Sequence, residues 1–202
     1  MGDSKEKNML LCEQCKLGNL TKVQKLLSNP NVQAGAYRDY PLQNACEHGH
    51  IEVVKLLLSL PLSRGVLPSS NDNRALRLAA KNGHSDIVQL LLNLPLERGV
   101  DPSALDNEAL IYASSYHRHD VVRILMESGR VDPGTQNNRA MRLACIHRDW
   151  NMVFILQSDP RTDYEDGLRF AGLETHGVLT VPRRNAEETD TPVVLDEDPI
   201  NI

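Results

Sequence analysis

Two short runs in this chain bring together residue types that bind metals or act as nucleophiles. Cys12 and Cys15 form a C-x-x-C pair, a spacing found in zinc and thiol redox sites. The second run is His117-Arg-His119-Asp120, in which two imidazoles and a carboxylate lie within four residues. A structural zinc ion takes about four ligands, however, and the sequence has no second C-x-x-C pair.

An internal repeat places both runs in a structural context. Four nine-residue segments align with one another, beginning at Leu42, Leu76, Leu110 and Met141, at spacings of 34, 34 and 31 residues. A weaker copy begins at Leu11. A period of this length indicates one supersecondary unit stacked on copies of itself.

The repeat alignment gives the cysteines and histidines packing and turn roles. Cys15, Cys46 and Cys145 occupy one repeat position, which other copies fill with alanine or serine, so we interpret them as small packing residues. His117 and His119 fall in the turn between two helices, where we expect them to be solvated. We therefore predict no catalytic residue, no metal site and no cofactor; the alternative is an enzyme whose turn histidines bind a metal.

Each unit has the pattern of two helices joined by a tight turn. Arg74–Asn82 carries small apolar residues on one face, and Gly83 supplies the left-handed turn. The second helix, His84–Asn93, has Val88 and Leu91 on the i, i+3 stripe of a helix buried on one side. The pattern predicts an all-α fold.

Copies differ from one another at turns and linkers. Two near-duplicate linkers, 60–68 and 94–102, carry three extra residues, which we expect to lengthen the second helix of each unit. His117 and Arg148 replace the turn glycine, and a positive φ there costs a non-glycine residue roughly 1 kcal/mol. These two copies should be less stable than the others.

These residues resemble the ankyrin repeat family. Gly49–Leu58 and Gly83–Leu92 are similar to its turn and second helix, and the Val-Asp-Pro linkers followed by an Asp-Asn or Asn-Asn pair are typical of a divergent form. The resemblance implies an ankyrin-repeat solenoid of about five helix–turn–helix repeats, a partial C-terminal capping repeat and a disordered acidic tail. We place the repeat domain at 1–173 and the tail at 174–202, with repeats near 8–38, 39–72, 73–106, 107–137 and 138–163 and a partial one at 164–173.

The resemblance also implies a non-enzymatic scaffold that binds a protein partner through its concave face, made of linker tips and the first helices. His50 and His84 would hydrogen-bond the neighbouring loop. Mapped onto this sequence, the concave face comprises Arg38, Tyr40, Asn73, Arg74, Lys81, Asn107, Glu108, Tyr112, Tyr116, Asn138, Arg139 and His147.

Charge and hydropathy exclude several other partner classes. A net charge of −5 and a pI of about 5.8 do not provide the positive field that nucleic acids or anionic membranes attract. No apolar run approaches the length of a spanning helix, and the start of the chain is polar. We expect a reducing intracellular location, cytoplasmic or nuclear.

The C-terminal part leaves two questions open. Trp150 and Phe154 are either covered by the partial unit around Tyr164 and Phe170 or exposed as a partner-binding patch. We expect a monomer, with an end-to-end dimer through this pair as the alternative.

The acidic tail suggests a second function. Val193–Asp198, an apolar triplet followed by three acids, resembles SUMO-interacting motifs. The alternative function is thus an adaptor or targeting subunit in a ubiquitin or SUMO pathway that uses this tail.

Overall fold

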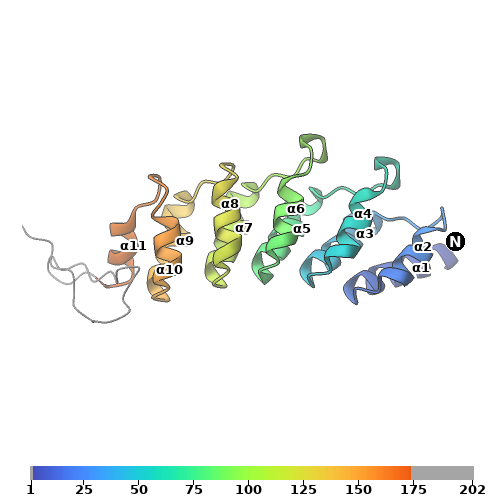
Figure 1. Ribbon diagram of the computed structural model, residues 1–202, viewed down its shortest axis with the longest axis horizontal. Helices are drawn as coiled ribbons and strands as arrows, with labels where there is room; N and C mark the ends of the chain where they lie inside the picture. The colour runs from blue at the N-terminus through green and yellow to red at the C-terminus, as the bar shows by residue number, and fades with distance from the viewer. Residues whose placement is uncertain (1, 174–202) are drawn as a thin grey trace, which may run out of the picture.

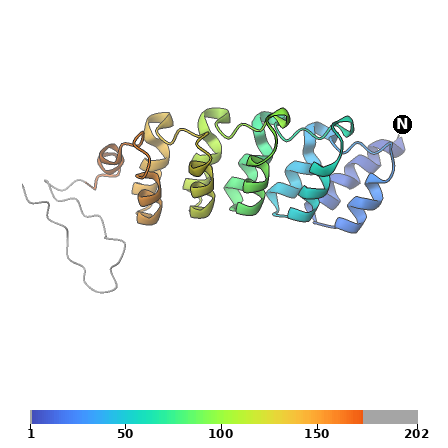
Figure 2. The same ribbon diagram turned by 45° about the horizontal axis from the view of Figure 1, so that its top comes forward.

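The computed structural model describes residues 2–173, apart from the side chains of residues 2, 3 and 96. Within this range the chain forms helices joined by loops, arranged as consecutive pairs in one elongated array (Figures 1 and 2). The first helices of the pairs are α1 (Gly2–Lys16), α3 (Ala36–Glu47), α5 (Ser70–Asn82), α7 (Ala104–Ser115) and α9 (Thr135–Ile146). The second helices are α2 (Leu20–Leu27), α4 (Ile51–Ser59), α6 (Ser85–Leu92), α8 (His119–Glu127) and α10 (Trp150–Leu156), and α11 (Tyr164–Phe170) follows them.

Small residues let the first helices approach one another closely. Ala79, Ala80 and Ala113 have 0% exposed area and belong to the core. The first helices contact one another more extensively than the second helices do.

The second helices bury the apolar stripe that the sequence predicts. Val54 and Leu57 in α4, and Val88 and Leu91 in α6, each have 0% exposed area. One continuous core runs through all the pairs from Leu11 to Leu168. The all-α fold class is confirmed.

A left-handed turn of three residues precedes the regular part of four first helices. In α5 it comprises Asn71, Asp72 and Asn73, with φ between 54° and 58°, and the same turn occurs in α3, α7 and α9. Asn and Asp tolerate this conformation better than other non-glycine residues do. The sequence analysis placed the start of this helix at Arg74, which is the residue that directly follows the left-handed turn in α5.

The extra residues in the two longer linkers do not lengthen the second helices. Helix α4 ends at Ser59 and Leu60 is extended, after which Leu62–Arg64 forms a separate 3-10 turn, η1. Leu96–Arg98, η2, is its counterpart after α6. The expectation of longer helices is wrong because Pro61 and Pro95 cannot donate the backbone hydrogen bond that continues a helix.

Arginines at the ends of these linkers tie consecutive pairs together. The Arg64 guanidinium donates to the carbonyl oxygens of Leu27 (3.1 Å) and Val32 (3.2 Å) in the preceding pair. Arg98 donates to the Leu58 carbonyl at 3.0 Å. The bonds to Leu27 and Leu58 satisfy carbonyls at the C-terminal ends of α2 and α4, which have no partner within the helix.

The C-terminal aromatic residues are only partly covered. Trp150 packs against the core, but Phe154 on α10 is 49% exposed. Phe170, expected to cover it, is itself 57% exposed and lies under the Arg142 guanidinium, 4.6 Å from the ring centroid. The expectation that the partial unit covers the aromatic pair is therefore wrong for Phe154.

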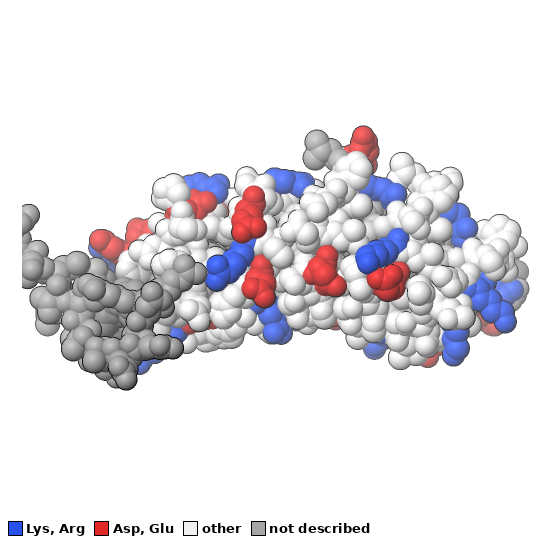
Figure 3. Space-filling model, viewed as in Figure 1, with Lys and Arg blue, Asp and Glu red and all other residues white. Residues whose placement is uncertain are grey.

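Charged side chains are dispersed on the face turned to the viewer in Figure 3. Lysine, arginine and acidic residues occur singly or in groups of mixed sign, separated by uncharged surface. No helix within residues 2–173 has both the length and the apolar character needed to cross a membrane.

Candidate functional site

The face formed by the first helices carries a connected group of polar and aromatic side chains at its centre. The Arg77 guanidinium on α5 forms an ion pair with the Glu108 carboxylate on α7. Lys81, one turn further along α5, places its Nζ 5.9 Å from the ring centroid of Tyr112 and 5.1 Å from that of Tyr116. We call Arg77, Lys81, Glu108, Tyr112 and Tyr116 the central cluster.

Contacts within the central cluster hold its side chains in place. A hydrogen bond between Tyr112 and Glu108 raises the pKa of the tyrosine and joins two residues one helical turn apart on α7. A cation over an aromatic face is attracted by the ring quadrupole, so Lys81 links the two tyrosines across the α5–α7 junction. Tyr116 is still 44% exposed and available to a partner.

The structure brings together four residues of the predicted partner-binding face, Lys81, Glu108, Tyr112 and Tyr116. Arg77, which the sequence analysis did not include, completes the group. The sequence could have indicated the ion pair, because Arg77 and Glu108 have opposite charges and are 31 residues apart, close to one repeat period. Other predicted positions are exposed elsewhere along the array: Arg38, Tyr40, Arg74, Arg139 and His147.

Asn73 and Asn107 do not belong to an exposed face. Their exposed areas are only 6% and 5%, and each amide oxygen accepts a backbone N–H from the following linker. The acceptor Asn73 binds the N–H of Asp101 at 2.9 Å, and Asn107 binds that of Asp132 at 2.8 Å. The prediction of a partner contact at these two positions is corrected to a structural role.

The same bond recurs at every copy of this repeat position, which forms a ladder along the array. Asn8, Asp39 and Asn138 accept the N–H groups of Gln33, Leu67 and Asp163, at 2.9, 2.8 and 2.9 Å. Asn138 is only partly buried. We call the five acceptors Asn8, Asp39, Asn73, Asn107 and Asn138 the linker ladder.

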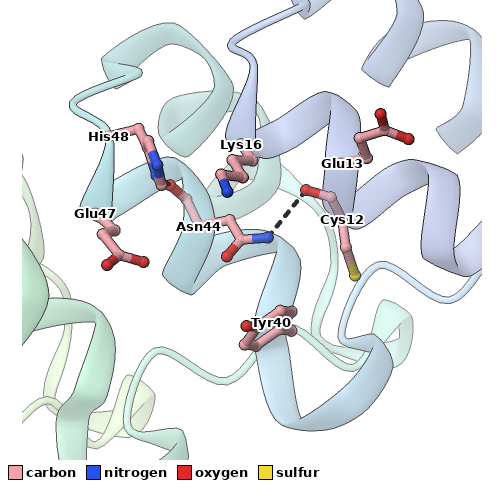
Figure 4. Close-up of a pocket in the computed structure, with 7 residues that line it drawn as sticks. All are labelled: Cys12, Glu13, Lys16, Tyr40, Asn44, Glu47 and His48. Carbon is pink, nitrogen blue, oxygen red and sulfur yellow. Dashed lines mark hydrogen bonds between the residues drawn. The ribbon is translucent and has the colours of Figure 1, made fainter.

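A shallow pocket extends the first-helix face toward the N-terminal end (Figure 4). It has a volume of about 360 Å³ and lies between α1 and α3. The Asn44 amide spans its floor and donates to the Cys12 carbonyl at 3.0 Å. The remaining lining residues are Glu13, Lys16, Tyr40, Glu47 and His48.

The cysteines are poorly suited to nucleophilic chemistry. Burial raises the pKa of the Cys12 thiol to about 11 and that of Cys15 to about 12. Desolvation likewise raises the pKa of Cys145 to about 11, and it also raises that of Cys46. The nucleophilic thiolate is therefore a minor form at neutral pH, and the side chains serve as small core residues.

The turn histidines are solvent-accessible, as predicted for His117, and both also contact a carboxylate of the next pair. His117 Nδ1 lies 2.7 Å from Asp149 Oδ2, and His119 Nε2 lies 2.8 Å from Asp149 Oδ1. Partial burial opposes ionisation of Asp149, but these bonds and the Met152 N–H outweigh it and lower its pKa. Within residues 2–173, no group of three or more His, Cys, Asp or Glu side chains is arranged to hold a metal ion.

His50 and His84 confirm the bonding role that the family resemblance implied. Their Nε2 atoms lie 2.9 Å from the Lys16 carbonyl oxygen and 3.1 Å from that of Glu47, at the ends of the preceding first helices. Arg118 makes the same contact with the Lys81 carbonyl. At the next junction the equivalent residue is Asp149, whose carboxylate cannot donate a hydrogen bond. There His117 and His119, from the preceding helix pair, bond to Asp149 instead.

Comparison with known proteins agrees with this geometry. A family model described as ankyrin repeats (3 copies) matches residues 9–106 and 76–166. No curated protein matches the chain. The acidic tail and its Val193–Asp198 segment lie outside the described residues.

Proposed function

Because the chain belongs to the ankyrin repeat family, we propose that it is a non-enzymatic scaffold that binds a partner protein through the face formed by its first helices. Ankyrin repeats are protein–protein interaction modules. The identity of the face is our inference.

The central cluster is the observation that carries this proposal. Tyrosine and arginine are enriched among residues that contribute most to binding energy at interfaces. Here Tyr112, Tyr116 and Arg77 stand on adjacent helices, and their contacts with Lys81 and Glu108 fix their orientations before binding. A surface ordered in advance loses little conformational entropy when a partner docks.

The proposed surface extends on both sides of the central cluster. Tyr40 and the N-terminal pocket lie on the α3 side, Arg139 lies on α9, and His147 directly follows α9. A partner of standard interface size would cover roughly 800 Å² of this surface. The full proposed set, after removal of the two buried asparagines, is Arg38, Tyr40, Arg74, Arg77, Lys81, Glu108, Tyr112, Tyr116, Asn138, Arg139 and His147.

Affinity capture with paired variants tests the proposal. Tyr112→Ala/Tyr116→Ala should reduce capture of the wild-type partner by about tenfold or more, since truncation of interface anchors commonly costs more than about 1 kcal/mol each. Gln89→Ala/Arg123→Ala is the matched control, because both of these exposed residues lie on second helices. Circular dichroism should show that both variants remain folded. Equal partner recovery by wild type and the tyrosine variant would refute the proposed face.

A further inference from the structure

A groove of about 560 Å³ opens at the N-terminal end of the array, between α1 and α2. Leu10, Leu26 and Val32 give it an apolar floor, and Lys7, Lys22 and Lys25 are basic residues along its lining. We call it the end groove. It is separate from the central cluster, which lies between α5 and α7.

Repeat positions explain why the end groove is open. Ala75, Ile87 and Leu91 hold the same repeat positions, 65 residues after Leu10, Lys22 and Leu26. In α5 and α6 these three residues have 0–1% exposed area, because the preceding pair covers them. No described helix pair precedes α1, and Leu10 is 43% exposed. The end groove thus corresponds to the docking side of a repeat, and no described repeat covers it.

Lysines alter the chemistry of this docking side. Lys22 and Lys25 stand where α6 has the apolar residues Ile87 and Leu90. Both lysines are exposed, and neither forms an ion pair with another described residue. A segment that fits the end groove should therefore offer apolar side chains for its floor and acidic side chains for its lysines.

The chain contains one such segment in its own sequence, outside the described residues. Val193-Val-Leu195 is an apolar triplet, and Asp196-Glu-Asp198 follows it directly. We propose that the end groove of one copy binds residues 193–198 of a second copy. The triplet covers Leu10 and Leu26, and the acids pair with Lys22 and Lys25.

The position of the chain's C-terminal part favours a second copy over self-docking. Leu173 follows α11, at the opposite end of the array from α1 (Figure 1). The 193 − 173 = 20 residues up to Val193 span at most about 70 Å when fully extended. Packed helices are about 10 Å apart, so the five junctions from α11 back to the first pair already require about 50 Å. Self-docking would therefore use most of the reach of this segment, whereas a second copy imposes no such constraint.

Sedimentation of the full chain tests the proposal. Because groove and segment are different surfaces, copies join head to tail, and the average mass should keep rising from micromolar to millimolar concentration. Lys22→Glu/Lys25→Glu should lower the association constant by about tenfold or more, since two attractive charge pairs become repulsive. Lys55→Glu/Arg123→Glu is the matched control, with the same charge change on α4 and α8.

A charge swap identifies the occupant. Asp196→Lys/Glu197→Lys should likewise associate at least about tenfold more weakly by itself, and mixing it with Lys22→Glu/Lys25→Glu should restore association, because the groove of each variant then meets a segment of opposite charge on the other variant. A wild-type chain that stays monomeric at every concentration would overturn the proposal. So would a mixture of the two variants that does not associate. Partner capture through the first-helix face is independent of either result.

Discussion

At the scale of single residues, Asp39 is the unusual member of the linker ladder. The other four copies have asparagine, whereas Asp39 places a carboxyl group with 2% exposed area at this position. Its Oδ1 accepts the Leu67 N–H, and its Oδ2 accepts a bond from the Ser70 hydroxyl. Burial nevertheless raises its pKa above the ordinary 3.8, although both bonds oppose that rise.

The raised pKa of Asp39 has a defined effect on stability. The folded state holds this proton more tightly than the unfolded state does, so the free energy of unfolding falls as pH rises from about 3.9 through the raised pKa. We predict that Asp39→Asn removes this loss and increases stability at pH 7 by about 1 kcal/mol. Urea unfolding at pH 4.5 and 7.5 measures the difference. The exposed Asp72→Asn is the control, and a variant less stable than wild type at pH 7 would contradict the prediction.

At the scale of elements, the turn between the two helices differs among copies. Gly18, Gly49 and Gly83 have φ of 69°, 77° and 84°, and the non-glycine residues His117 and Arg148 adopt 58° and 52°. The sequence prediction of a left-handed turn at these two positions is therefore confirmed. His117 gains a bond to Asp149 in this conformation, whereas Arg148 has an exposed side chain.

We predict that Arg148→Gly increases the free energy of unfolding by about 0.5–1 kcal/mol, because glycine adopts positive φ without a steric penalty. At the equivalent turn position of an earlier repeat, Gly49→Ala should decrease the free energy of unfolding by more than about 1 kcal/mol. A Cβ at Gly49 would lie 2.6 Å from the His84 ring carbon Cε1. Urea unfolding of both variants checks the two signs. Loss of stability in Arg148→Gly would show that its side chain makes a compensating contact.

At the scale of the whole molecule, stability depends on neighbours in the stack. Each helix pair contacts mainly the pairs before and after it, and no contact joins the two ends of the described array. The linker ladder and the linker arginines also connect consecutive pairs. In such an array, stability is approximately a sum of repeat and nearest-neighbour terms.

We predict that Ala79→Leu, at a position with 0% exposed area between first helices, lowers the free energy of unfolding by about 1–3 kcal/mol. Hydrogen exchange should accelerate most in α3–α8 and least in α10 and α11, since the excess volume separates adjacent pairs only. Arg74→Leu, on the exposed side of α5, is the control. An equal increase in exchange along the whole array would contradict nearest-neighbour coupling.

Much of this protein follows from the sequence alone. The repeat period, the alternation of Ala-rich and Leu-rich helices and the turn glycines specify a helical stack, because each feature reports a local conformation or a buried face. Cys15, Cys46 and Cys145 share one repeat position and all have 0% exposed area, so their packing role was also predictable.

Tertiary structure decided which polar residues face a partner and which face the protein. Asn73 and Arg74 are adjacent and both polar, yet one joins the linker ladder and the other is exposed. Three consecutive left-handed residues set that difference, and their dihedrals have no simple sequence signature. The contacts of Lys81 with two tyrosines, and of two histidines with Asp149, likewise depend on the spacing between neighbouring pairs. That spacing results from packing along the whole stack, which no single repeat contains.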